Sequence, residues 1–192
     1  ISDVPWTNVW YATDLNEGGS LPSNGASIGD GTGGTTWKDL IGTVNLGTVT
    51  LVGNMPVFRT PDSNLNGKPS VEFDGTDDFL TGTLGSTYTD PLDIVMCYKQ
   101  RSLSPGNIRA IFDTATGVHK SILTLFDANW WMNDAGANSI SSSNSLDTNT
   151  HIIRGRFDPS TSGNLSFIQI DGTKTQGNMT NAGGMANFLF GS

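Results

Sequence analysis

The sequence predicts an all-β fold, a two-sheet antiparallel β-sandwich, from three observations. Short segments alternate apolar and polar residues, which is the period of strands with one buried face. Turn-forming residues separate these segments, and Gly alone accounts for 24 of the 192 residues. Only 15% of the residues are charged, and no segment has the apolar spacing of an amphipathic helix. A sandwich or jelly roll is favoured over a propeller, because no internal repeat is present.

The first part of the chain predicts short strands around one long loop. Residues 6–11 form the first strand, with two tryptophans as core anchors. Residues 14–34 form a surface loop, because a segment this rich in Gly, Ser and Asn buries too little apolar surface to be a core element. Residues 43–52 and 56–58 then supply further short strands.

Residues 64–82 predict a strand, a tight acidic turn and a second strand. Val71 and Phe73 alternate with polar residues, as in a half-buried strand. The Asp-Gly pair that follows is a turn signal, and the apolar pattern resumes at Phe79. We therefore expect strand, turn and strand in this order.

Residues 93–100 predict a buried strand that holds the only cysteine of the chain. Its apolar residues occupy both faces, with Val95 and Cys97 on one of them. We expect Cys97 to be a buried small hydrophobe rather than a nucleophile. A single cysteine forms no intrachain disulfide.

The second half of the chain predicts further strands and turns from the same patterns. The pair Asp171-Gly172 is expected to form a tight hairpin turn. A polar, serine-rich segment at 139–149 is expected to be a loop. Strands are expected at 108–113 and 121–126, and these two are expected to pair with each other. Further strands are expected at 151–157 and 165–170, and a last strand begins at 186–192.

The formal net charge of −8 and the pI near 4.4 disfavour nucleic acids and anionic membranes as partners, because both attract basic surfaces. The ten basic residues form no run. No apolar run of about 20 residues is present, so membrane insertion is not expected. The chain starts at Ile1 rather than Met, which leads us to expect that a leader or an upstream domain has been removed.

Five pieces of sequence, in a fixed order, cover nearly the whole chain. They are VWYATDL, WKDL at 37–40, MPVF, LNGKPSVEFDGTDDFL and HIIRGRFDPSTSGNLSFIQIDGT, of which FDGTDDFL is the most specific. Their order resembles the laminin-G-like, concanavalin A-like lectin jelly-roll family, and within it the bacterial and phage surface-protein branch. The resemblance implies one jelly-roll domain over residues 1–192 that binds glycans or proteins. It also implies a closing strand that is missing after residue 192 or is supplied by a neighbouring molecule.

The sequence shows no catalytic constellation. Glycoside hydrolysis normally needs two positioned carboxylic acids, and the only glutamates, Glu17 and Glu72, share no motif. The two histidines, His119 and His151, accompany no Gly-x-Ser-x-Gly elbow and no zinc-type ligand set. We therefore expect a protein that is not an enzyme and has no catalytic residues.

Asp74, Asp77 and Asp78 bring three carboxylates together within five residues. Oxygen-rich clusters of this kind bind Ca²⁺, so a structural or ligand-bridging calcium is one interpretation. The other, which we favour, is a solvated acidic turn whose side chains accept hydrogen bonds from backbone N–H groups. No other cofactor is expected.

Trp130 and Trp131 are the candidate ligand-binding residues. Successive residues of a strand point to opposite faces, so if this segment is a strand, one ring lies in the core and the other is directed outward. An exposed tryptophan stacks on sugar rings or anchors a protein interface, and Asn129, Asn133 and Asp134 could hydrogen-bond sugar hydroxyls. The alternative is that both rings pack at the rim of the core.

These observations lead to three functional hypotheses. The first is a non-catalytic recognition module of a virion or extracellular surface protein, which binds glycans or a host surface. The second is a structural phage protein that decorates a capsid or fibre, with other protein subunits as its only partners; a homotrimer would suit that role. The third is an ancillary carbohydrate-binding domain of a secreted polysaccharide-degrading enzyme. All three place the chain outside the cell or on a virion surface.

Overall fold

The computed structural model contains two compact units. One comprises residues 1–85 with 191–192, and the other comprises residues 86–190. The predicted strand at 6–11 and most of the segments 14–34 and 43–52 lie outside the described residues. The structure describes residues 24–28, 36, 37, 44, 46, 47, 54–103, 109–114, 120–124, 129–134, 138–159, 165–180 and 184–191.

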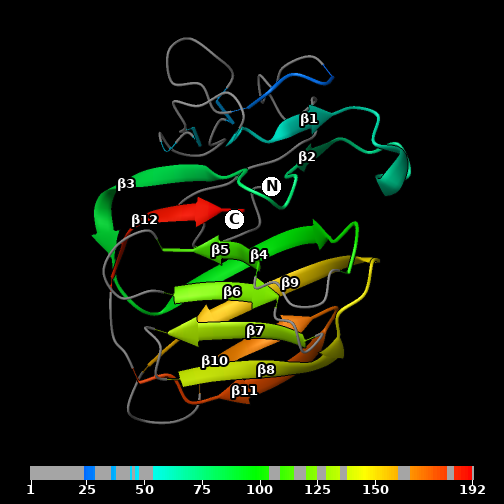
Figure 1. Cartoon of the computed structure of the whole chain (residues 1–192). Coiled ribbons are helices and arrows are strands. Elements are labelled where there is room, and N and C mark those ends of the chain that lie inside the picture. The colour runs from blue at the N-terminus through cyan, green and yellow to red at the C-terminus, as the bar shows by residue number, and fades with distance from the viewer. Residues whose placement is uncertain are drawn as a thin grey trace, which may run out of the picture. The chain divides into compact units, whose positions relative to one another are not determined.

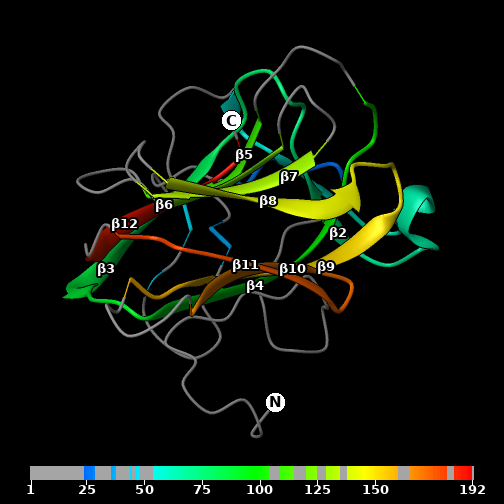
Figure 2. The same ribbon diagram turned by 90° about the horizontal axis from the view of Figure 1, so that it is seen from below.

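Two antiparallel sheets, built mainly by strands of the second unit, face each other (Figure 2). The smaller sheet has the strand order β11-β10-β9-β4, and the larger has the order β3-β12-β5-β6-β7-β8 (Figure 1). The predicted all-β, two-sheet antiparallel sandwich is therefore confirmed. The strands of these sheets are β3 (Leu80–Tyr88), β4 (Leu92–Lys99), β5 (Arg109–Asp113), β6 (Lys120–Thr124), β7 (Asn129–Asp134), β8 (Asn138–Ser145), β9 (Thr150–Phe157), β10 (Ser166–Ile170), β11 (Thr173–Gly177) and β12 (Met185–Phe190).

Trp130 anchors the core between the two sheets. Its side chain is fully buried on β7 and meets two rings of the smaller sheet edge to face. The centroid of Tyr98 on β4 lies 5.5 Å away, and that of His151 on β9 lies 5.4 Å away. Ile153 and Phe157 continue the inward row of β9 and are also fully buried. Burying one side chain of this size contributes about 1.5–3 kcal/mol, so these contacts hold the sheets together.

Gly155 lets side chains of the larger sheet approach β9. A Cβ atom at this position would lie 2.8 Å from Ile122 Cδ1 and 3.1 Å from Met132 Sδ. Both distances are shorter than ordinary van der Waals contacts between such atoms, so the absent side chain leaves room that β6 and β7 fill.

The first unit contains strand β1 (Val57–Arg59), the 3₁₀ helix η3 (Ser63–Leu65) and strand β2 (Ser70–Glu72), with β1 and β2 antiparallel. Phe58 of β1 is fully buried. After β2 comes the acidic turn, and then β3, so the predicted order of strand, turn and strand is confirmed. Within the described part of the chain, no helix is long and apolar enough to cross a membrane.

The strands predicted for the second half of the chain are present, and their ends lie within two residues of the expected ones. β5 and β6 are antiparallel neighbours, as predicted. The turn Asp171-Gly172 has positive φ at both residues, 49° and 88°. This is the backbone that a two-residue Asp-Gly hairpin requires.

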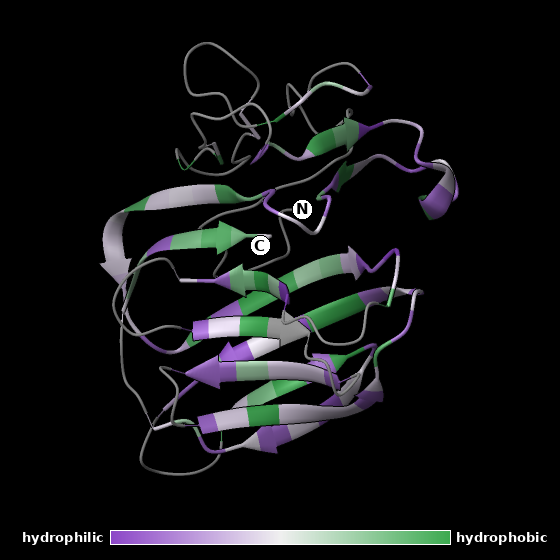
Figure 3. Ribbon diagram, in the orientation of Figure 1, coloured by the Kyte–Doolittle hydropathy of each residue, from purple (hydrophilic) through white to green (hydrophobic). Residues whose placement is uncertain are grey.

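The prediction of a loop at 139–149 is wrong, because strand β8 covers most of this segment. β8 pairs antiparallel with β7 over residues 138–141 and again at Ser145, with a register shift in between. Figure 3 shows β8 as hydrophilic or near-neutral apart from one short hydrophobic stretch. Its ladder with β7 and the burial of Ile140 therefore hold a strand that hydropathy alone does not reveal.

The prediction that Cys97 is buried is also wrong, because the residue is exposed. On β4 it shares the outward face with Val95, which is 65% exposed, and it lies opposite Ile152 of β9, which is 53% exposed. Partial burial nevertheless raises the pKa of the Cys97 thiol, and the charge of Asp171 adds to this effect. Cys97 is therefore no activated nucleophile.

Gly155→Val is expected to lower the free energy of unfolding by about 1–3 kcal/mol, because a branched side chain would overlap Ile122 and Met132 in a filled core. Urea unfolding followed by circular dichroism measures the change. Gly85→Val is the matched control, since a Cβ atom there meets nothing within 4 Å. An equal loss in the two variants would contradict the close approach of the sheets at Gly155.

Candidate functional site

The alternation of β7 divides the five candidate ligand-binding residues between two faces of the sheet. Trp130 and Asp134 are fully buried and point into the core. Asn129, Trp131 and Asn133 are half-buried and occupy the outward positions of the strand. One tryptophan thus lies inside and the other outside, as expected for a strand. Only the outward three are placed where a ligand could reach them.

Strand β8 brings hydroxyl groups beside the outward tryptophan. In the ladder between β7 and β8, Trp131 lies opposite Ser141 and Asn133 lies opposite Ser139. Directly opposite residues of an antiparallel pair share one face of the sheet. We call Asn129, Trp131, Asn133, Ser139 and Ser141 the β7–β8 face.

The β7–β8 face has the chemistry of a site for a neutral, hydroxyl-rich ligand. Its indole ring offers an apolar surface on which a sugar ring can stack. Its two amides and two hydroxyls can each donate and accept hydrogen bonds. None of its five side chains is charged. The face therefore suits neutral ligands better than phosphorylated or sulfated ones.

The predicted metal residues Asp74, Asp77 and Asp78 lie together in the turn between β2 and β3. One carboxylate oxygen of each lies within 4.8 Å of the others. Asp74 Oδ1 accepts hydrogen bonds from the N–H groups of Thr76 at 2.7 Å and Asp77 at 3.3 Å. Asp78 Oδ2 accepts one from the N–H of Asp74 at 2.7 Å. These are the contacts expected for an acidic turn whose carboxylates accept hydrogen bonds from backbone N–H groups, which we call the capping interpretation.

The two capping carboxyls have opposite pKa shifts. The pKa of Asp74 is lowered, chiefly by the hydrogen bond from the Thr76 N–H. Burial raises the pKa of Asp78 because it disfavours the charged form, and the charges of Asp74 and Asp77 act in the same direction. A cation would relieve this crowding of negative charge as well, so calcium at the turn stays a prediction.

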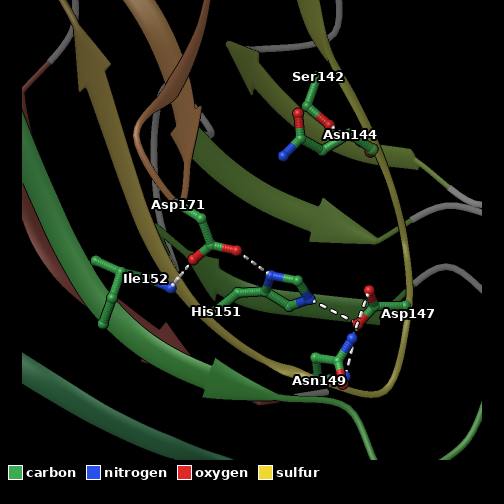
Figure 4. Close-up of polar contacts among 7 residues, drawn as sticks. All are labelled: Ser142, Asn144, Asp147, Asn149, His151, Ile152 and Asp171. Atoms are coloured by element: carbon green, nitrogen blue, oxygen red, sulfur yellow. Dashed lines mark hydrogen bonds and ion pairs between the residues drawn. The ribbon is translucent and has the colours of Figure 1, made fainter.

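His151 lies between two aspartates, an arrangement that the sequence analysis did not identify. Its Nδ1 lies 2.6 Å from Asp171 Oδ2, and its Nε2 lies 2.9 Å from Asp147 Oδ1 (Figure 4). Asp171 also accepts a bond from the N–H of Ile152 at 2.8 Å, and Asp147 accepts one from the N–H of Asn149 at 2.6 Å. We call His151, Asp147 and Asp171 the histidine clamp. It ties the β8–β9 loop and the β10–β11 turn to the start of β9.

The pKa of His151 is raised overall. Burial of the ring opposes the protonated form, but the hydrogen bonds and charges of Asp171 and Asp147 outweigh it. The pKa values of Asp171 and Asp147 are lowered, mainly by the N–H groups of Ile152 and Asn149 respectively. Two carboxylate acceptors match an imidazolium, which donates from both nitrogens. Because both nitrogens are engaged, the clamp suits a structural role rather than proton transfer to a substrate.

Ion pairs cover part of the outward face of the smaller sheet. Asp93 on β4 lies 2.9 Å from Arg154 and 3.0 Å from Arg156, both on β9. Arg156 also lies 2.9 Å from Asp158. Both arginines are therefore engaged with carboxylates of the same chain, and an acidic ligand would have to displace them.

Comparisons with protein-family models, with curated proteins and with solved structures give no match. The family resemblance of the sequence therefore stays a prediction.

Asp74→Ala is expected to lower the free energy of unfolding by about 1 kcal/mol, the usual loss when a capping side chain is removed. Asp74→Asn is the matched control, because its amide oxygen can still accept the two backbone bonds, and it should lose less. Thermal unfolding measures both. Under the capping interpretation, millimolar calcium leaves the Tm of the unsubstituted chain unchanged. A calcium-dependent rise in Tm that Asp74→Asn abolishes would show the metal interpretation to be the right one.

The histidine clamp is expected to make stability depend on pH near neutrality. Because the folded pKa of His151 is raised, its contribution is complete below the unfolded value of about 6.5 and is lost as the pH rises through the folded value. Asp147 and Asp171 affect stability at low pH. Because their pKa values are lowered in the folded chain, the stability that they contribute is lost as the pH falls through these folded pKa values.

Urea unfolding at several pH values tests the clamp. The difference in unfolding free energy between the unsubstituted chain and His151→Gln should be largest below about pH 6.5 and should shrink at higher pH. Thr83→Ala, a substitution of an exposed, uncharged residue of β3, is the control and should leave the pH profile unchanged. A difference that does not vary with pH would contradict a charged His151 in the folded protein.

Proposed function

We propose that this chain is a non-catalytic recognition module that binds neutral glycans through the β7–β8 face. The observation that carries the proposal is the outward row of Asn129, Trp131 and Asn133 on one strand. Alternate residues of a strand lie about 6.5–7 Å apart, so an amide flanks the indole ring on each side. A sugar ring stacked on Trp131 would find hydrogen-bonding groups at both of its ends.

Charge supports the neutral character of the ligand. The net charge of −8 repels polyanions, and the five side chains of the β7–β8 face contribute no positive charge that would attract them. The resemblance to laminin-G-like, concanavalin A-like jelly rolls points to the same class of ligand. It also implies a module of a virion or an extracellular surface protein, or one beside the catalytic domain of a secreted polysaccharide-degrading enzyme.

A second surface feature favours a different candidate, a structural role with protein partners. Val95 and Ile152 are the two most exposed large hydrophobic residues of the described chain. They lie on the adjacent strands β4 and β9, and Cys97 lies opposite Ile152. Apolar residues grouped on an exposed face are typical of protein contacts. This surface would suit a capsid or fibre decoration protein, for which a homotrimer is the expected assembly.

Trp131→Ala is expected to weaken glycan binding at least about tenfold, because the loss of a stacking ring removes roughly 1.4 kcal/mol or more. An array of neutral oligosaccharides screened with the purified chain supplies the ligand, and calorimetry with that oligosaccharide measures the affinity.

The matched control for the glycan experiment is Val95→Ala, which truncates an exposed residue of the other sheet and should keep full affinity. Unchanged binding in Trp131→Ala would contradict the assignment of the site. Binding of acidic glycans alone would contradict the class of ligand. A chain that binds no glycan and forms a stable oligomer in solution would favour the structural candidate.

A further inference from the structure

A lysine side chain is buried inside the second unit, where charged groups are seldom found without a partner. Lys120 begins β6, and its side chain is 1% exposed. Its Nζ lies 3.0 Å from Oδ2 of Asp90, whose side chain is 9% exposed. Asp90 belongs to the connection between β3 and β4. Water is therefore nearly excluded from this amine and this carboxyl.

Two further groups of the second unit define the surroundings of Lys120. The ring centroid of Phe157, on β9, lies 5.3 Å from the Nζ atom. Asp134 is fully buried and lies opposite Lys120 in the ladder between β6 and β7. Opposite residues of an antiparallel pair have Cβ atoms about 4.5–5.5 Å apart. One amine, two carboxyls and an aromatic ring thus share this part of the interior.

The buried pair holds a nucleophilic group against an electrophilic one. Transfer of one proton from the ammonium to the carboxylate would give a neutral amine beside a neutral acid, the two forms between which an amide bond can form. A nucleophile and an electrophile held in contact behave as an intramolecular pair, for which effective molarities of about 10⁵–10⁸ M are known. The exclusion of water also protects a product against hydrolysis.

We propose that Lys120 and Asp90 become joined by an amide bond in the folded chain. The lone pair of the neutral Nζ attacks Cγ of the protonated Asp90 side chain, and an N–C bond forms. A C–O bond of that carboxyl then breaks, and its hydroxyl leaves with one amine proton as a single water molecule. No oxidant, reductant or cofactor takes part.

Asp134 is the group that moves the proton. Its carboxylate accepts the proton from the attacking nitrogen and returns it to the departing hydroxyl, as a general base and then a general acid. The product connects the β3–β4 segment to β6 through side chains. With a single cysteine, the chain has no intrachain disulfide that could provide such a cross-link.

The intact mass of the purified full chain, measured after unfolding, tests the proposal. We expect the measured mass of nearly all molecules to be lower than the mass calculated from the sequence by the mass of one water molecule. Trypsin should release a branched peptide that joins residues 60–99 to residues 110–154, because an acylated Lys120 is not cleaved. An intact mass without loss of water, after folding and prolonged incubation at neutral pH, would overturn the proposal.

Three variants locate the bond. Lys120→Arg keeps a positive charge but forms no such amide, so it should have the full mass of its own sequence. Lys174→Arg changes an exposed lysine of β11 and should still lose one water. Asp134→Asn should slow the appearance of the lighter species about 100-fold, the usual size of a general acid–base contribution. Loss of water in Lys120→Arg would overturn the cross-link, and an unchanged rate in Asp134→Asn would overturn the role of Asp134.

Discussion

The packing of Trp130 between the two sheets is the contact on which the rest of the structure depends. Because its ring meets Tyr98 and His151 of the smaller sheet, β7 can turn only one set of alternate residues toward the core. Trp131 is thereby directed outward, and a register shift of one residue would exchange the two rings. The same alternation places Asp134 inside, beside Lys120 of the neighbouring strand. The positions of Trp130 in the core, of Trp131 on the outer face and of Asp134 beside Lys120 therefore all follow from a single strand register.

Strand β9 has a buried basic group near each of its ends. At its start His151 is held by Asp147 and Asp171, and at its end Phe157 packs against Lys120, which Asp90 accompanies. Both basic groups have carboxylate partners, as their burial requires. Their chemistry differs, because an imidazole exchanges its proton reversibly near neutral pH, whereas an amine held against a carboxyl can form a bond. The sandwich therefore combines a titratable contact with a cross-linkable one.

Local patterns were enough to predict the fold class, because strand alternation and Asp-Gly turns are signals carried by a few neighbouring residues. The strand β8 gives no such signal, since its stability comes from its ladder with β7 and from one buried apolar residue, Ile140. The exposure of Cys97 could not be predicted either, because which face of a sheet is covered is a tertiary property. His151 and Asp171 are 20 positions apart, and Lys120 and Asp90 are 30 apart. No sequence pattern marks such pairs, which only the folded chain brings together.

The indole N–H groups of Trp130 and Trp131 test the central claim most directly. Nuclear magnetic resonance of the ¹⁵N-labelled chain reports how fast each exchanges with water and whether it moves when a neutral oligosaccharide is added. We expect the Trp130 indole to exchange slowly and to stay in place, because it is fully buried. The Trp131 indole should exchange faster and shift on titration. Equal exchange of the two, or a shift confined to Trp130, would contradict the alternation of β7 and the recognition surface built on it.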